Sequence, residues 1–366
     1  MKTSERNSYM LKGRKAKNGY DWWWHDIIAI NDLTGKPERF FIEYYILNPK
    51  ISPSKIVLGQ ENKEFKLKPS YSKVIAGKWG ESKSQIHNYF PSNNFNSAKS
   101  GLDIKIGDNI CSEDYLKGSV FQSKENSAKP ELMTDAGEMS WDLQISEKVS
   151  YSVGYGASSI FRKMNLFKMY WHVEGLRTKY SGKIVYNGQS YSANPSKFIG
   201  YQDKNWGSDY TNPWIWLSCS NFFDSENKKV DNVSFDVGGG RPVVLGIPLK
   251  GKILVAYYDN GQIFDFNFTK LFFQKQKWNC SEDENYIYWN IDVENRLNAL
   301  EINYKCEKST MLKINYENPK GEKNHNNLWN GGFAEGTLKF YKKENKKKIL
   351  IRELYGNLGG CEFGKY

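Results

Sequence analysis

The chain has 366 residues, of which 15% are aromatic, and carries a formal net charge of +11. This length suits about two domains, and the abundance of Tyr, Phe, Trp, Gly and Asn favours strands and turns. No stretch approaches the roughly 18 apolar residues of a membrane span, and the N-terminus lacks an apolar signal-peptide core. The five cysteines are scattered without a CxxC pair. This spacing signals neither a disulfide framework nor a metal site, so we expect a cytoplasmic protein.

The positive charge is compatible with nucleic acid or an anionic membrane surface as a partner. Most lysines, however, are single and lie among polar residues, and the one dense run, residues 342–348, falls where a hairpin tip is expected. We interpret the run as a solvated turn and expect no nucleic-acid partner. Transient contact with a membrane surface is left open, as is the oligomeric state.

In chain order, the predicted elements are almost all strands, because apolar and polar residues alternate and long 3.6-residue periodicity is missing. Residues 21–30 (DWWWHDIIAI) and 39–47 (RFFIEYYIL) predict a pair of buried strands, the second closed by Asn48-Pro49. Residues 91–140 are polar and rich in turns. The best candidate for a short helix or crossover is 161–170, so we expect one domain over residues 1–168 and a second over 169–366.

Three β-hairpins are expected in the second half of the chain. Asn187-Gly188 and Asn260-Gly261 each separate two β-rich runs, and Asn-Gly supplies the positive φ angles of a type I′ turn. A third hairpin joins GTLKFY to KKILIREL through the lysine-rich run. The class is therefore predicted to be all-β.

Most of the functional information lies between residues 203 and 220. The block Asp203-Lys204-Asn205-Trp206-Gly207 is followed seven residues later by Trp214-Ile215-Trp216. On a strand, Trp214, Trp216, Ser218 and Ser220 share one face. Indoles beside small hydroxyls suit the wall of a ligand cavity, although tryptophans that only pack the core would give the same pattern.

These two blocks resemble the signature of the tocopherol cyclases, which runs Glu-Lys-Asn-Trp-Gly and then Trp-Phe-Trp. The resemblance continues through residues 171–188, 238–240, 258–261 and 360–364 and more loosely toward the N-terminus. It implies two lipocalin-like antiparallel β-barrel or sandwich domains with a ligand pocket near their junction. Carotenoid 1,2-hydratases and Diels–Alderase-type cyclases belong to the same superfamily, and the hydratases carry Asp at the position of Asp203.

Two departures from the family concern the pocket. Ser218 and Ser220 stand where the tocopherol cyclases carry Gln and Asn. The polar groups that hold the substrate head group therefore differ, and we take both serines as candidate substrate contacts.

Asp203 is the leading candidate for an acid. Protonating an alkene carbon requires a carboxylic acid that burial keeps protonated. The cation that forms then needs π faces, which we assign to Trp206 and Trp216. Asn205 is expected to orient the acid or hold a substrate oxygen, with an ordinary turn residue as the alternative. Glu362, flanked by apolar residues in the last strand, is either a second buried carboxylate or an outward-facing one.

Three further residues complete the candidate substrate site. Glu43 interrupts an apolar strand, with an outward-facing edge position as the alternative, and Trp24 belongs to the triple tryptophan of the strand before it. Lys204 points away from Asp203 on an extended chain, so a surface salt bridge competes with a binding role.

By resemblance, the chain is expected to be a cofactor-independent enzyme that binds a hydrophobic isoprenoid or polyene. It would catalyse intramolecular cyclisation, or addition of water, at a carbon–carbon double bond. No metal is expected. The alternative from another class is a non-catalytic carrier of lipid or pigment on the same fold, since lipocalin-like barrels also bind ligands without chemistry.

Overall fold

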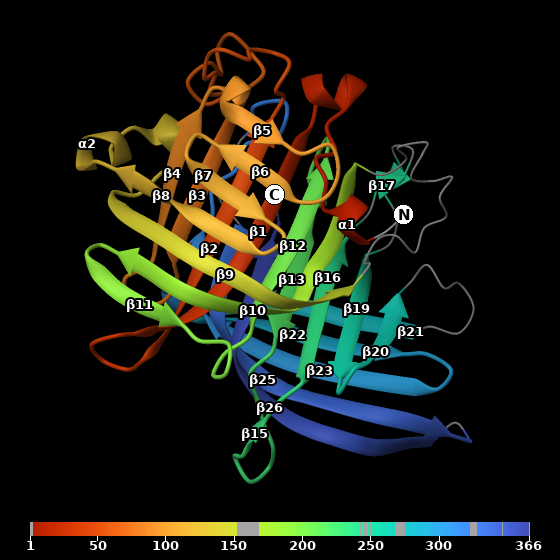
Figure 1. The fold of residues 1–366 in the computed structure, drawn as a ribbon. Helices are drawn as coiled ribbons and strands as arrows, with labels where there is room; N and C mark the ends of the chain where they lie inside the picture. The colour runs from red at the N-terminus through yellow and green to blue at the C-terminus, as the bar shows by residue number, and fades with distance from the viewer. Residues whose placement is uncertain are drawn as a thin grey trace.

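The computed structural model describes residues 3–151, 168–241, 243–244, 247–248, 251–267, 275–322, 328–345 and 347–365. These residues form two antiparallel sheets of twelve strands each, stacked one above the other in Figure 1, and a separate two-stranded pair. The predicted all-β class is confirmed. The few helical turns are short: α1 (Thr3–Arg6), η1 (Gly13–Lys17), η2 (Ser92–Asn94), α2 (Lys124–Ser127), η3 (Pro130–Leu132) and η4 (Lys308–Thr310).

The first sheet follows the order β4-β3-β2-β1-β11-β10-β9-β8-β7-β6-β5, and β12 pairs with both β1 and β10. It curls into a barrel in which β8 meets β4, where the Gln122 side chain donates to the His87 carbonyl at 2.6 Å. Its strands are β1 (Tyr20–Asn31), β2 (Pro37–Leu47), β3 (Tyr71–Lys78), β4 (Ser84–Phe90), β5 (Phe95–Ser97), β6 (Asp103–Ile106), β7 (Asn109–Ser112), β8 (Tyr115–Gln122), β9 (Gly137–Tyr151), β10 (Met169–Tyr186), β11 (Gln189–Ala193) and β12 (Gly200–Gly207).

The second sheet follows the order β20-β19-β16-β13-β26-β25-β23-β22-β21, with β14, β15 and β24 beside this path. The Gln276 side chain of β21 donates to the Ile253 carbonyl at 2.7 Å and links the two ends of the curved sheet. Its strands are β13 (Trp214–Cys219), β14 (Phe222–Phe223), β15 (Lys229–Val230), β16 (Val233–Gly240), β19 (Lys252–Asp259), β20 (Gln262–Asn267), β21 (Lys275–Glu282), β22 (Tyr286–Glu294), β23 (Asn298–Glu307), β24 (Leu312–Lys313), β25 (Leu328–Glu344) and β26 (Lys347–Gly364). The separate pair is β17 (Val243–Val244) and β18 (Ile247–Pro248).

The hairpin predictions are confirmed. Asn187 and Asn260 both adopt φ of 47°, and the glycine after each also has positive φ, as a type I′ turn requires. Asn345 has the same φ at the tip between β25 and β26, within the lysine-rich run. The expected strands 21–30 and 39–47 pair as β1 and β2.

The division between the sheets does not coincide with the expected domain boundary at 168/169. Strands β10, β11 and β12 all belong to the first sheet, because β12 inserts between β1 and β10. The chain passes to the second sheet between Gly207 and Trp214. Of the expected helix or crossover at 161–170, residues 161–167 lie outside the described residues, and Met169 already begins β10.

Alternation along the strands produces three cores. One fills the first barrel, one lies against the concave side of the second sheet, and the third joins the two sheets. On β1, Trp23 belongs to the barrel core, while Trp24 belongs to the joining core and Trp22 packs against it. The face of β1 that carries Trp22 and Trp24 is therefore directed at the second sheet.

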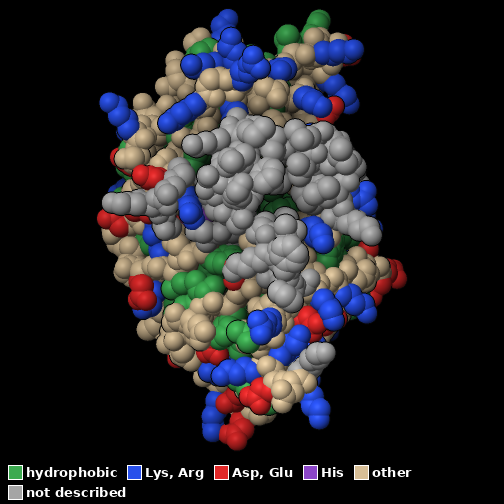
Figure 2. All heavy atoms as spheres, turned by 90° about the vertical axis from the view of Figure 1, so that its right-hand side faces the viewer, with side chains coloured by type: hydrophobic (Ala, Val, Ile, Leu, Met, Phe, Trp, Pro, Cys, Tyr) green, Lys and Arg blue, Asp and Glu red, His purple; other side chains and the backbone are tan. Residues whose placement is uncertain are grey.

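A buried ion pair also joins the sheets. Arg39 of β2 binds both carboxylate oxygens of Asp26, and one of its terminal nitrogens donates to the carbonyl oxygens of Gly332 and Leu358 in the second sheet. On the surface, charged side chains of both signs are dispersed over the face in Figure 2, where hydrophobic side chains lie beside residues that are not described.

Candidate active site at the junction of the two sheets

Two cavities that share four lining residues lie in the joining core, and we call them together the junction cavity. The space open to a water-sized molecule is about 20 Å³ in each, so a larger substrate enters only if the lining side chains move apart. The shared residues are Trp22, Trp214, Tyr316 and Glu362; the first cavity adds Trp24, Asp203, Asn205 and Trp216, and the second adds Met169, Tyr210, Thr211 and Leu328.

Strand register places these side chains on facing walls. Trp24 is opposite Asp203 in the β1–β12 pair, and residues directly opposite share a face of the sheet. From the second sheet, Trp216 of β13 is opposite Glu362 of β26. Asp203 and Glu362 thus reach one cavity from different sheets.

Asp203 lies half-buried among the aromatic side chains of the cavity wall. Its Oδ2 accepts a hydrogen bond from Trp171 Nε1 at 2.7 Å, while Oδ1 has no hydrogen-bond partner. Burial raises the pKa of Asp203 well above its ordinary value; the Trp171 bond opposes this rise, and the nearby carboxyl of Glu362 adds to it. Burial therefore favours the protonated form of Asp203.

The Glu362 carboxylate accepts one hydrogen bond more than that of Asp203. Oε2 accepts from Trp214 Nε1 and Oε1 from Asn330 Nδ2, both at 2.6 Å. Burial raises the pKa of Glu362 to about 7, with these two donors working against the rise. Of the alternatives for Glu362, the structure places it half-buried and hydrogen-bonded in the cavity wall, not facing outward.

Glu43 is buried behind the cavity wall and does not lie at an outward-facing edge. Its Oε2 accepts from the hydroxyl of Tyr316, a lining residue, at 2.6 Å. Burial raises the pKa of Glu43 to about 7, and the charge of Lys73 opposes the rise. Lys73 itself is buried without a hydrogen-bond partner, and its Nζ lies 4.8 Å from the ring centre of Tyr45 and 5.2 Å from that of Tyr316.

The aromatic walls are tightly packed. Trp22 stacks on Tyr316 with ring centres 5.4 Å apart, and Trp171 meets Trp214 edge to face at 5.8 Å. Glycines make room for two of the indoles: a Cβ at Gly238 would come within 2.3 Å of Trp171, and one at Gly360 within 2.3 Å of Trp216. The indoles of Trp171 and Trp216 are thus held in fixed positions.

Lys204 and Trp206 do not line the junction cavity. Both lie on the opposite face of β12 from Asp203, as alternation requires. Lys204 forms a buried ion pair with Asp21, and its Nζ lies 3.7 Å from the ring centre of Trp23. Trp206 stacks on Tyr170 at 5.5 Å. The expected roles in substrate contact and cation stabilisation therefore do not fit their positions.

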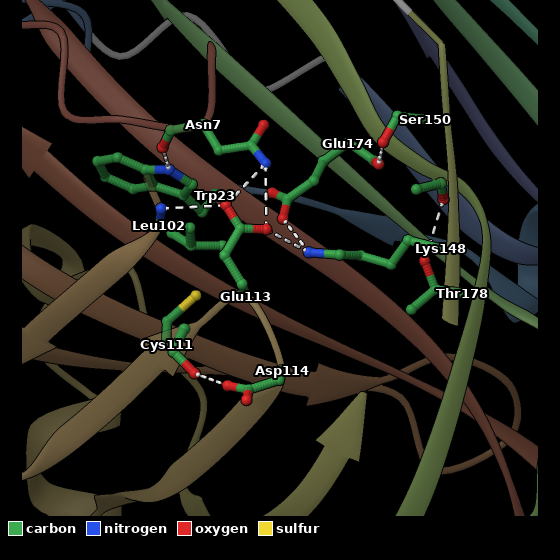
Figure 3. A network of polar contacts seen from close by, with 12 residues as sticks. Asn7, Trp23, Leu102, Cys111, Glu113, Asp114, Lys148, Ser150, Glu174 and Thr178 are labelled. Atoms are coloured by element: carbon green, nitrogen blue, oxygen red, sulfur yellow. Dashed lines mark hydrogen bonds and ion pairs between the residues drawn. The ribbon is translucent and has the colours of Figure 1, made fainter. Parts of the chain in front are cut away.

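The side of β1 that faces away from the cavity carries its own polar network (Figure 3). Lys148 Nζ contacts Glu113 at 2.6 Å and Glu174 at 2.8 Å, and Asn7 reaches Glu113 at 3.2 Å. The indole of Trp23 donates to the Asn7 carbonyl at 2.8 Å. Charges in the first barrel are thus paired, and we read them as structural.

The two serines also lie apart from the cavity. Ser218 is buried on the cavity-facing side of β13 but is not a lining residue. Ser220 lines a different hollow at the surface, and its Oγ lies 2.8 Å from Ser234 Oγ. Asn205, in contrast, does line the cavity and accepts from the Tyr20 hydroxyl at 2.9 Å. Trp24, Trp214 and Trp216 lie where the sequence predicted them.

Sequence reasoning missed six lining residues, Trp22, Met169, Tyr210, Thr211, Tyr316 and Leu328, and two residues that bond to the lining, Trp171 and Asp236. Tyr316 lies outside any strand, and Trp171 and Asp236 contact the site through pairings that the sequence does not display. Asp236 accepts from Trp216 Nε1 at 3.0 Å, and burial raises its pKa to about 8 against this bond. Trp22 could have been predicted from the sequence, since alternation places it on the same face of β1 as Trp24.

Paired lipocalin-like β domains with an acidic, indole-walled cavity at their junction define the class of this protein. Residues 27–365 match the family described as tocopherol cyclase-like, and the chain belongs to that family. Two solved structures share the fold over 100% of this chain at 12% identity. They are an AttH-like protein of Nitrosomonas europaea (TM-score 0.51, 97% of that chain) and kievitone hydratase of Nectria haematococca (TM-score 0.50, 96% of that chain). A comparison with curated proteins gives no match.

Two further findings bear on the sequence predictions. No group of three or more His, Cys, Asp or Glu side chains among the described residues is arranged to hold a metal ion. Within the same residues, no helix has the length and apolar character needed to cross a membrane.

Proposed function

We propose that this protein is an enzyme that protonates a carbon–carbon double bond of a hydrophobic isoprenoid or polyene substrate, without a cofactor. The observation that carries the proposal is the presence of two carboxyls in one cavity, each held by different hydrogen-bond donors. Burial raises the pKa of Asp203 well above its ordinary value, which favours its protonated form, and raises the pKa of Glu362 to about 7. Two carboxyls in different environments can serve as acid and base. Family membership supports the same class of chemistry.

In the proposed reaction, the Asp203 carboxyl transfers its proton to one alkene carbon, and the other carbon becomes a tertiary cation beside Trp216 and Trp24. A substrate hydroxyl, or a water molecule, adds its oxygen lone pair to the cation. The proton released from that oxygen passes to the Glu362 carboxylate. A proton then returns from Glu362 to Asp203 through solvent, which restores the enzyme. The product is an isomer of the substrate, or the substrate plus one water.

The test combines mass spectrometry with a matched pair of variants. Purified protein is incubated with prenylated quinols and polyenes, and turnover is compared for wild type, Asp203→Asn and Asp236→Asn. Both aspartates accept an indole N–H, but only Asp203 lines the cavity. We expect Asp203→Asn to lower turnover by about 10²–10⁴-fold, the usual contribution of a general acid.

Asp236→Asn should retain turnover within a few-fold, since its side chain does not line the cavity and an Asn oxygen can still accept from Trp216 Nε1. Full activity of Asp203→Asn would end the assignment of Asp203 as the acid. If ligand is recovered only unchanged across the panel, although it binds, the protein is a carrier instead of an enzyme.

A further inference from the structure

A second hollow opens at the surface, apart from the junction cavity and sharing none of its lining residues. Its volume is about 250 Å³, which is large enough for a small polar molecule. The residues that matter for its chemistry are Arg177, Lys179, Lys197, Ser220, Lys229 and Asp231.

Arg177 forms the inner wall of this hollow. Its side chain is only 8% exposed, and one of its terminal nitrogens donates to the Val233 carbonyl and to Ser234 Oγ, both at 2.9 Å. None of the ion pairs in the described part of the chain involves Arg177. The charges of Asp231 and Glu147 act on Arg177 only from beyond ion-pair distance. A buried guanidinium without a direct carboxylate partner is costly, and an anion in the hollow would supply one.

The rim adds further positive charge. Lys197 and Lys229 are exposed, and Lys229 Nζ donates to the Lys197 carbonyl, which holds the two residues together. Lys179 is already paired with Glu147, and Asp231 is the single acid among the lining residues. The hollow therefore has an excess of two positive charges, since three other cations, Arg177, Lys197 and Lys229, face the single acid Asp231.

We propose that this hollow binds the phosphate group of a phosphorylated small molecule or of a lipid head group. A phosphate monoester carries a charge of about −1.5 to −2 at neutral pH, which matches the excess of two positive charges. The planar guanidinium of Arg177 suits two phosphate oxygens at once, and the two lysines reach them from the rim. The site is separate from the junction cavity, so phosphate binding and turnover can be measured independently.

The experiment is calorimetric titration of the full chain with inorganic phosphate, in a buffer free of other polyvalent anions. A second arm measures co-sedimentation with phosphatidylcholine vesicles that contain phosphatidic acid. The variant is Lys197→Ala/Lys229→Ala, which changes only exposed side chains. The control, Lys50→Ala/Lys105→Ala, removes two exposed lysines that do not line the hollow. Arg177→Met tests the inner wall, and circular dichroism establishes that each variant is folded.

We expect Lys197→Ala/Lys229→Ala to weaken binding by roughly tenfold, because it removes two charge contacts that water partly screens. The control should bind like wild type. A loss confined to the phosphate arm identifies a free phosphorylated molecule, and a loss confined to the vesicles identifies a lipid head group. If neither probe binds wild type, or if variant and control bind both probes equally, the proposal is wrong. Unchanged binding by folded Arg177→Met would likewise remove the inner wall from the site.

Discussion

The replacement of Glu362 by Gln tests the electrostatics of the junction cavity without a substrate. Glu362 lies half-buried in the cavity wall, and its pKa rises from 4.5 in the unfolded chain to about 7 in the folded protein. A group with a raised folded pKa contributes stability below its unfolded pKa, and this contribution is lost as the pH rises through its folded pKa. Gln has the same shape and does not titrate, so the difference between wild type and variant isolates this one carboxyl.

The rise in pKa sets the size of the effect. The pKa of Glu362 rises from 4.5 to about 7, and each pKa unit corresponds to about 1.4 kcal/mol. The protonated carboxyl therefore stabilises the fold by roughly 3 kcal/mol relative to the ionised one. The free energy of unfolding of wild type, relative to Glu362→Gln, should therefore fall by roughly 3 kcal/mol between pH 4.5 and about 8. A constant offset of about 1–3 kcal/mol is also expected, because the Gln amide cannot accept from both Trp214 and Asn330.

The assay is urea unfolding of both proteins at half-unit steps from pH 4.5 to 8.5. Exposed Glu64 provides the control, since Glu64→Gln also removes one carboxylate but leaves the cavity intact. The advantage of wild type over Glu362→Gln in unfolding free energy should fall as the pH rises. An advantage that stays constant over this range, or that grows with pH, would refute the conclusion that burial sets the pKa of Glu362.

Three other substitutions follow from the same geometry. Arg39→Met leaves the Asp26 carboxylate buried and unpaired. The free energy of unfolding, measured in urea, should therefore fall by about 3–5 kcal/mol. A loss under about 1 kcal/mol would show that the pair does not join the sheets. Gly360→Ala drives a methyl group into Trp216 and should cost about 1–3 kcal/mol and shift the indole fluorescence, whereas an unchanged spectrum would contradict the contact. Trp171→Phe removes the N–H that donates to Asp203 and so raises the pKa of Asp203 further. The alkaline limb of the curve of turnover against pH should therefore move to higher pH. A limb that stays in place would show that Asp203 is not the acid.

Local features of the fold could be predicted from the sequence because they depend on neighbouring residues. The Asn-Gly turns at 187–188 and 260–261 need only positive φ at two positions, and the β1–β2 pair needs only two adjacent apolar runs. The place where one sheet ends could not be predicted in this way. It depends on β12 pairing with β1, and the partners Trp24 and Asp203 are far apart in the chain. Alternation gives no information about such distant partners.

The same limit applies to the site. Alternation separates Asp203 and Asn205 from Lys204 and Trp206, but it does not say which set faces the ligand. The position of the second sheet determines which set lines the cavity. It covers the face of β12 that carries Asp203, and Lys204 lies inside the first barrel. Tyr316 lies in no strand, so no periodicity could have identified it.

The structure gives a physical reason for the two-part signature. Its first block ends the first sheet and its second block begins the second, so the linker between Gly207 and Trp214 places Asp203 and Trp216 around one cavity. The two carboxyls then acquire different properties from different sheets. Asp203 receives one N–H, from its own sheet, whereas Glu362 receives two, both from the second sheet. Burial raises the pKa of both carboxyls, that of Glu362 to about 7. Asp203 and Glu362 therefore line one cavity only when the sheets are docked, so the proposed chemistry requires the junction and not either barrel alone.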